Sequence, residues 1–123
     1  MTDARKSGME VRRAVLGNAH VDRAEASRTP LNEEFQDFIT RYVWGEIWTR
    51  PGLDRRTRSC ITVAMLVALN RSDELALHVR AALRNGVTVD ELKEILLQTA
   101  IYCGIPAAGS AFGVAARVLA EAE

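Results

Sequence analysis

Glu46 is the first side chain with possible chemistry, because a helical reading of the sequence places it among apolar residues. With about 100° per residue, Glu46 lies near Phe35 in the middle of an apolar stripe, if the helix continues through Gly45. Burial raises the pKa of a carboxylic acid and a nearby arginine lowers it. A group perturbed in either way can move a proton or anchor a catalytic base. The alternative is that Gly45 breaks the helix and Glu46 faces solvent or pairs with an arginine.

His78 is the second candidate, at the edge of another apolar stripe and about 60° from Leu75. An edge position borders both the core and any cavity beside it. A neutral imidazole can accept or donate a proton at cellular pH. The alternative is a core histidine whose hydrogen bonds are satisfied. His20 lies in a polar stretch and carries no prediction.

Four arginines within nine residues form the third feature: Arg50, Arg55, Arg56 and Arg58. They surround the predicted start of a helix at Asp54, where each exposed cation opposes the helix dipole by about 0.3–1 kcal/mol. A bound carboxylate would compensate, because free N–H groups and planar guanidinium forks both suit that anion. The alternative is a solvated helix start in which Glu46 and Asp54 supply the negative charge.

The two cysteines, Cys60 and Cys103, form neither a CxxC motif nor a zinc-ligand spacing. A dithiol redox role is therefore unsupported, and no metal site is predicted. Cys103 is expected to be a small buried hydrophobe. Tyr102 beside it could donate a hydrogen bond to a ligand, or could be a core tyrosine with a satisfied hydroxyl.

Helices are the elements expected to position these side chains, because strand-like alternation is absent. A first helix covers residues 3–17, with Val11, Val15 and Leu16 as its apolar side. Residues 18–29 are expected to be irregular, and Pro30 and Asn32 open a second helix. The second helix carries a stripe predicted to be buried: Phe35, Phe38, Ile39, Tyr42 and Val43. Asp54 caps a third helix that runs to about Leu69 and is expected to be central and covered on most sides.

Three further helices complete a six-helix bundle of orthogonal and antiparallel helices, an all-α fold. Ser72 caps the fourth helix, which carries an apolar stripe of Leu75, Val79, Ala82 and Leu83 and ends at Asn85-Gly86. Thr88 and Glu91 form a capping box for the fifth, whose apolar side is Leu92, Ile95, Leu96, Thr99 and Cys103. Gly104 ends that helix, and Pro106 starts a small-residue helix over residues 107–122.

The 123 residues fit one domain, read here as an N-terminal extension over residues 1–29 and a helical core over residues 30–123. Sixteen basic and sixteen acidic residues give no net charge, which argues against nucleic acid or anionic lipid as a partner. The longest apolar run, residues 63–69, is far shorter than the ~20 residues needed to cross a bilayer. A soluble, cytoplasmic protein is expected.

Several motifs together resemble the carboxymuconolactone decarboxylase family: WGEIWTRPGL at residues 44–53, Arg58-Ser59, Ala64-Met65-Leu66, Glu74-Leu75 with His78, Asn85-Gly86-Val87-Thr88, and YCGIPAA at residues 102–108. The resemblance covers about residues 35–111. It extends to GMEVR at residues 8–12, VLG at residues 15–17 and His20-Val21. It implies an all-helical fold shared with the alkylhydroperoxidase-D group, assembled as a homo-oligomer, either a trimer or a hexamer.

This sequence departs from the peroxidase-like relatives of that group at the thiol motif. Where those relatives have a CxxC pair before the histidine that corresponds to His78, this sequence has Arg71 and Glu74. Ser59 replaces their upstream glutamate. The resemblance therefore does not extend to thiol chemistry.

The resemblance implies a cofactor-free decarboxylation of 4-carboxymuconolactone, a small dicarboxylate lactone, to 3-oxoadipate enol-lactone in protocatechuate breakdown through the β-ketoadipate route. In this hypothesis Arg50 and Arg58 bind the substrate carboxylates and Arg55 is a reserve. His78 is the general acid or an electrophile at the lactone oxygen. Glu46 orients and charges it or carries the proton, and Tyr102 could donate to the lactone oxygen.

Two other functions remain open at this point. One is a peroxidase-like enzyme that uses Cys60 or Cys103, and the other is a non-catalytic helical oligomer that binds a small molecule.

Overall fold

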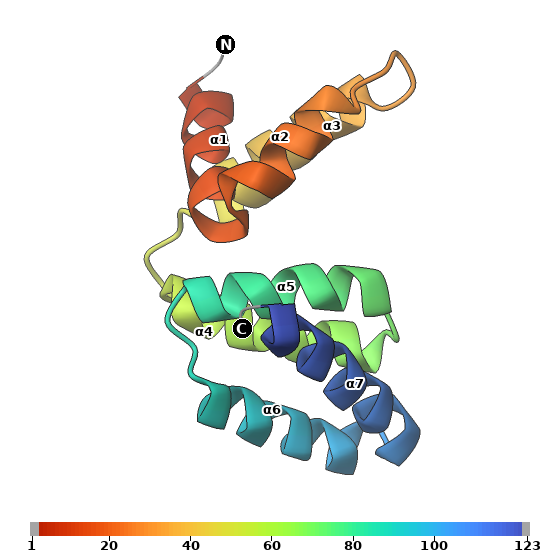
Figure 1. The fold of residues 1–123 in the computed structure, drawn as a ribbon. Helices are drawn as coiled ribbons and strands as arrows, with labels where there is room; N and C mark the ends of the chain where they lie inside the picture. Colours follow the sequence, from red (N-terminus) through yellow and green to blue (C-terminus); the bar gives the residue numbers. More distant parts are fainter. Residues whose placement is uncertain (1–2, 122–123) are drawn as a thin grey trace. The chain divides into compact units, whose positions relative to one another are not determined.

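The structure is a computed structural model that describes residues 3–121. Its elements are α1 (Asp3–Leu16), α2 (Asn18–Ala26), α3 (Glu33–Ile39), the π-helix η1 (Thr40–Ile47), α4 (Arg55–Ala68), α5 (Ser72–Arg84), α6 (Val89–Tyr102) and α7 (Ile105–Glu121). No strand occurs in this part of the chain, so the all-α class is confirmed, with seven α-helices rather than six (Figure 1).

The chain divides into two compact units, one ending at Asp54 and the other beginning at Arg55. The sequence predicts one domain, divided into an extension over residues 1–29 and a core over residues 30–123. That single-domain organisation stays a prediction. No helix within residues 3–121 is long and apolar enough to cross a membrane.

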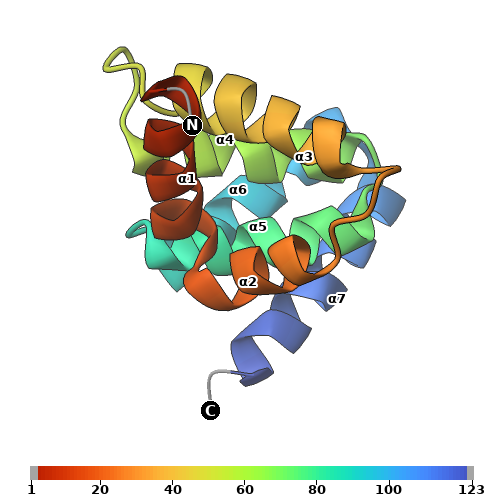
Figure 2. The same cartoon turned by 90° about the horizontal axis from the view of Figure 1, so that it is seen from above.

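In the first unit, α1 packs closely against η1. Val11, Val15 and Leu16 on α1 are buried, as the sequence predicts. A Cβ added at Gly8 would overlap the carbonyl oxygen of Thr40, so only glycine allows this approach of two backbones. Seen from above, α3 and η1 form one continuous rod, and the start of α1 lies against its η1 end (Figure 2).

The prediction that residues 18–29 are irregular is wrong, because α2 occupies Asn18–Ala26. The helix restarts after Gly17, whose φ of 89° lies in the left-handed region that favours glycine. Its helical pattern is weak in sequence because Val21 is its one fully buried residue. Side-chain contacts hold it instead: Arg13 on α1 donates to Asn18 at 3.2 Å and to Asp22 at 2.8 Å.

The apolar stripe of the second predicted helix is not buried in this chain. Phe35 is 60% exposed, and Phe38 and Tyr42 are each 50% exposed. The rings of Phe38 and Tyr42 stack on each other with centroids 5.6 Å apart. The sequence analysis therefore assigned the wrong face of this helix to the core.

One physical reason is that α1 packs on another face of this segment, where Arg12 binds Gln36 and Thr40. In addition, the helix changes from α to π at Thr40. A π-helix bonds i to i+5, so its turn is wider than the 3.6-residue period used to find the stripe. The N–H of Trp48 donates to the carbonyl of Val43, five residues earlier, at 2.9 Å. The buried residues of this segment are consequently spaced by four: Thr40, Trp44 and Trp48.

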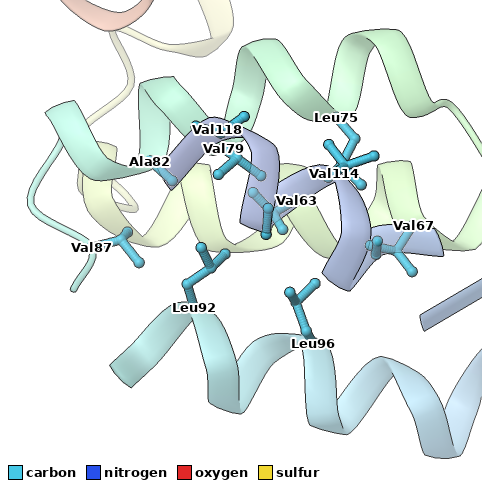
Figure 3. Close-up of a cluster of buried hydrophobic side chains, with 12 residues drawn as sticks. Val63, Val67, Leu75, Val79, Ala82, Val87, Leu92, Leu96, Val114 and Val118 are labelled. Atoms are coloured by element: carbon cyan, nitrogen blue, oxygen red, sulfur yellow. The ribbon is translucent and has the colours of Figure 1, made fainter. Parts of the chain in front are cut away.

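The second unit has a core built from all four of its helices (Figure 3). The predicted stripe of α5 is confirmed, with Leu75, Val79 and Ala82 each at most 3% exposed. So is the stripe of α6, whose Leu92 and Leu96 are fully buried. The side-chain amide of Asn85 donates to the hydroxyl of buried Ser59 at 3.0 Å, joining the end of α5 to the start of α4.

The local stop and start signals of this unit are also confirmed. Gly86 and Gly104 end α5 and α6 with φ of 97° and 101°, and the reciprocal capping box of Thr88 and Glu91 is present. Ser72 is a small correction: it is the first residue of α5, and the preceding Arg71 is at the cap position without a side-chain cap bond.

The expectation that α4 is covered on most sides is wrong for this chain. Its buried face consists of Ser59, Val63 and Val67. The opposite face exposes Met65 and Leu69 by 58% and 67%. The reason is that α5, α6 and α7 of the same unit pack on one side of α4.

Candidate active site

Glu46 lies on η1 and is exposed, so its interpretation as a desolvated carboxylate is wrong. The helix is not broken at Gly45, as the alternative supposed, but continues to Ile47 with the wider π turn. Glu46 lines a hollow of about 310 Å³ together with Ala4, Phe38, Arg41 and Tyr42. Carboxylate, guanidinium and two stacked aromatic rings therefore share one open hollow of the first unit. Sequence reasoning missed Arg41 because a spacing of five residues is not a helical neighbour in an α-helix.

Arg50 follows η1 in a tight turn. Its backbone N–H donates to the carbonyl of Ile47 at 3.1 Å, and the hydroxyl of Thr49 donates to the carbonyl of Gly45 at 2.9 Å. The Arg50 side chain is exposed. The turn thus presents a guanidinium directly after the element that carries Glu46.

The remaining three arginines of the cluster lie on the first turn of α4 and differ in their surroundings. Arg56 forms an ion pair with Glu91 of α6, which also closes the capping box through its other oxygen. Arg55 is exposed, and Arg58 is partly buried, with its Nε shielded from solvent. Glu91 is thus a partner for the cluster that sequence reasoning missed, because the two residues are far apart in the chain.

His78 lies on α5 at the edge of the buried stripe, as predicted. The residue is partly buried, and its Nδ1 is shielded from solvent. One turn earlier, Glu74 accepts two hydrogen bonds from Arg71, at 2.6 and 3.4 Å. These bonds are the main reason that the pKa of Glu74 is below its usual range. A carboxylate that stays ionised therefore lies one helical turn from the imidazole.

Tyr102 is 82% exposed at the end of α6, which rules out a core tyrosine within this chain. It lines a cavity of about 350 Å³ between α4 and α6, together with Cys60, Gln98 and Cys103. Both cysteines are free and partly buried. Within the described residues, no group of three or more His, Cys, Asp or Glu side chains is placed to hold a metal ion.

The candidate residues are divided between the two units. Glu46 and Arg50 belong to the first, whereas Arg55, Arg58, His78 and Tyr102 belong to the second. Their roles in chemistry stay predictions.

Comparison with known proteins gives the class of this helical fold. The sequence profile of the "Carboxymuconolactone decarboxylase family" matches residues 33–117, a segment that contains all six candidate site residues. The chain therefore belongs to the carboxymuconolactone decarboxylase family.

Particular relatives carry more detailed names. A 4-carboxymuconolactone decarboxylase of Acinetobacter baylyi is 50% identical over 116 residues, which cover 94% of this chain and 87% of that protein. A nitrosuccinic acid decarboxylase of Metarhizium robertsii is 43% identical over 99 residues, 80% of this chain and 69% of that protein. A 4-carboxymuconolactone decarboxylase of Pseudomonas putida is 55% identical over 40 residues, 32% of this chain and 83% of that sequence.

Proposed function

We propose that this protein is a carboxy-lyase that converts 4-carboxymuconolactone to 3-oxoadipate enol-lactone without a cofactor, as a step of protocatechuate catabolism. The observation that carries the proposal is the 50% identity to the Acinetobacter decarboxylase over 94% of the chain. The proposal includes a cytoplasmic location.

The substrate itself supplies the electron sink in this reaction. The bond between the ring carbon and the leaving carboxylate breaks, and CO₂ departs. The electron pair passes through the conjugated double bond to the lactone carbonyl, giving a dienolate. A proton then adds to the carbon next to that carbonyl. The protein must hold a dianion, stabilise the growing negative charge and deliver one proton.

Each of these tasks has a candidate side chain. Arg50 and Arg58 bind the carboxylates, with Arg55 in reserve, because a guanidinium fork binds a carboxylate at two points. Arg56 is left out because it is paired with Glu91. His78 donates the proton.

Two further residues have less direct support. Glu46 is the second candidate for moving the proton, and its exposed position in a hollow beside Arg41 leaves it accessible to a ligand. Tyr102 is the candidate donor to the lactone oxygen, since its exposed side chain lines a cavity.

The test follows substrate absorbance and CO₂ release with the purified protein and four variants. His78→Gln and Glu46→Gln should lower kcat, and Arg58→Met should raise KM or lower kcat/KM. Arg56→Met is the matched control and should leave KM unchanged. Wild-type protein that releases no CO₂ would refute the proposed activity, whereas normal turnover by His78→Gln would remove only that residue from the chemistry.

Nitrosuccinic acid is a second candidate substrate because of the Metarhizium relative. A nitro group, like a conjugated carbonyl, can accept the electron pair left by CO₂. Both acids should therefore be assayed side by side under the same conditions. A higher kcat/KM for nitrosuccinic acid would reject the lactone as the preferred substrate.

A thiol-dependent peroxidase is the rival enzyme, and the surroundings of His78 argue against it. Arg71 and Glu74 are joined as an ion pair one turn before the histidine. Mass spectrometry after mild peroxide treatment tests the remaining thiols, Cys60 and Cys103. Peroxide-dependent oxidation coupled to turnover would favour the rival. Lactone binding without any CO₂ release would instead favour a non-catalytic binding protein.

We also propose that the protein assembles as a homo-oligomer, a trimer or a hexamer. Several apolar side chains on or directly after α4 and α6 are exposed in the single chain, and we call them the α4–α6 face: Ile61, Met65, Leu69, Ile101, Tyr102 and Ile105. Three of these residues, Ile101, Tyr102 and Ile105, are exposed by more than 70% and are consecutive or nearly so. Large exposed apolar patches of this kind mark association surfaces, and a second copy of the chain would cover it.

A further inference from the structure

We infer that Arg12 of α1 is a positioning residue for the reaction: its buried guanidinium holds the start of η1 and thereby sets the direction of Glu46. The inference rests on the proposed role of Glu46. It concerns the first unit alone, since α1, α3 and η1 all precede Asp54.

Arg12 is a charged side chain inside the first unit, only 3% exposed. One terminal nitrogen donates to the hydroxyl of Thr40 at 3.2 Å and the other to the side-chain oxygen of Gln36 at 3.1 Å. Its Nε is buried and makes no hydrogen bond within residues 3–121. Desolvation is the main cause that lowers the pKa of Arg12, and the charge of Glu25 opposes it in part, although Glu25 makes no hydrogen bond to Arg12 among the described contacts. A buried cation with neutral partners is costly, so a specific task is expected of it.

The two partners of Arg12 mark the point where the helix changes type. Gln36 lies in the last turns of α3, and Thr40 is the first residue of η1. The Thr40 hydroxyl also donates to the carbonyl of Gln36 at 2.9 Å. Arg12 thus binds one residue of the α-helix α3 and one residue of the π-helix η1, on the two sides of the junction where the backbone hydrogen bonds change from i+4 to i+5. π-turns inside helices are uncommon and occur often at functional sites.

A second contact from α1 supports the same junction. The position of a Cβ on Gly8 would lie against the Thr40 carbonyl oxygen and 2.9 Å from the Gly45 nitrogen. These two atoms are five residues apart, the spacing that a π-turn joins. Gly8 and Arg12 are one turn apart on α1, so a single face of this helix contacts the wide turn at two places.

Glu46 follows Gly45 directly and takes its direction from this turn. A return to α-helical bonding would shift the segment by about one residue step, which rotates a side chain by about 100°. Glu46 would then turn away from the hollow that it shares with Phe38, Arg41 and Tyr42. An error of about 1 Å in the position of a reacting group can cost about 100-fold in rate.

The tryptophans provide a readout that is independent of activity. The chain has two, Trp44 on η1 and Trp48 directly after it, with ring centroids 5.1 Å apart. Near-ultraviolet circular dichroism in the tryptophan bands therefore reports the geometry of this segment. A general loss of helix would appear separately in the far-ultraviolet spectrum.

The experiment compares Arg12→Met with Arg13→Met, its neighbour, whose exposed ion pair with Asp22 lies away from η1. A second pair, Thr40→Val and Thr40→Ser, removes or keeps the hydroxyl that Arg12 binds. We expect Arg12→Met and Thr40→Val to change the tryptophan signal and to lower kcat by about 100-fold with KM within about twofold. Arg13→Met loses contacts to α2 rather than to η1, so it and Thr40→Ser should keep the tryptophan signal and the kcat of the wild type.

The results separate this inference from the proposed function. If Arg12→Met does not fold, the comparison of Thr40→Val with Thr40→Ser tests the inference in its place. An unchanged tryptophan signal in the folded variants overturns the inference whatever their activity. Loss of kcat in Glu46→Gln but not in Arg12→Met or Thr40→Val overturns the inference and leaves the proposed function intact. Normal kcat in Glu46→Gln refutes the role of that residue and the inference with it.

Discussion

Glu91 makes two interactions that substitutions can separate. These substitutions test whether Arg56 is a structural partner of Glu91 rather than a residue that binds substrate. One carboxylate oxygen accepts the Thr88 N–H at 2.9 Å in the capping box, and the other pairs with Arg56. In Glu91→Gln the amide oxygen can still accept the Thr88 N–H, but the charge is lost. Glu91→Ala removes both interactions. The difference between the two variants therefore isolates the cap from the ion pair.

The exposure of the Arg56–Glu91 ion pair sets the expected changes in the free energy of unfolding. The side chains of Arg56 and Glu91 are 42% and 38% exposed. Solvent screens such a pair, so Glu91→Gln should lower the free energy of unfolding by about 0.2–1 kcal/mol. The cap adds about 1 kcal/mol, so Glu91→Ala should lose about 1–2 kcal/mol. Added salt should reduce the loss in Glu91→Gln and leave the cap contribution unchanged.

Urea unfolding followed by far-ultraviolet circular dichroism measures these values, with Arg56→Met as the second arm of a double-mutant cycle. In the Glu91→Gln background, Arg56→Met should cost nothing further. In the lactone assay Arg56→Met should keep KM within about twofold of wild type, unlike Arg58→Met. Equal losses in Glu91→Gln and Glu91→Ala, or a KM effect of Arg56 as large as that of Arg58, would refute this assignment.

Three other predictions concern packing, pH and assembly. Gly8→Ala forces a methyl group against a backbone carbonyl and should destabilise the fold by about 1–3 kcal/mol. Gly113→Ala in α7, where a Cβ meets open space, should be neutral or stabilising by up to about 1 kcal/mol in the same unfolding assay. Arg80 lowers the pKa of Glu121 through hydrogen bonds, so this pair stabilises the protein above about pH 4.3, the unfolded value, and loses that effect as pH falls through the lower folded value. The stability difference between wild type and Glu121→Gln should shrink steadily as pH falls below the unfolded value, and a difference that is unchanged by acid would contradict this cause. Ile101→Asp on the α4–α6 face should reduce the assembly to smaller species in analytical ultracentrifugation, and unchanged sedimentation would exclude that face.

The second unit could be predicted largely from sequence because its signals are local. The glycine stops at Gly86 and Gly104 and the capping box at Thr88 each depend on a few neighbouring residues. The apolar period of α5 and α6 matches the core that those helices form. By contrast, the pairing of Arg56 with Glu91 depends on how α4 and α6 pack, and no local pattern encodes it.

The first unit was predicted poorly because contacts between its helices decide its structure. α2 has a single fully buried apolar residue and depends on Arg13 of the preceding helix. η1 has a width that a 3.6-residue period cannot describe, and Gly8 and Arg12 of α1 contact its first turn. Glu46 does lie beside Phe38 and Tyr42 of the predicted stripe, but that stripe is exposed in this chain, so only the predicted burial of Glu46 is wrong.

Two features of the first unit that depart from the sequence-based predictions share one property: they lower stability. Within the first unit a guanidinium is buried on α1 while two stacked aromatic rings stay exposed on α3 and η1, and each choice lowers the stability of an isolated chain. The second unit follows the local rules at nearly every helix end. Natural sequences break such rules mainly where function or association compensates. In the first unit this cost lies around η1, next to Glu46, and this is the physical reason to look for positioning residues on α1.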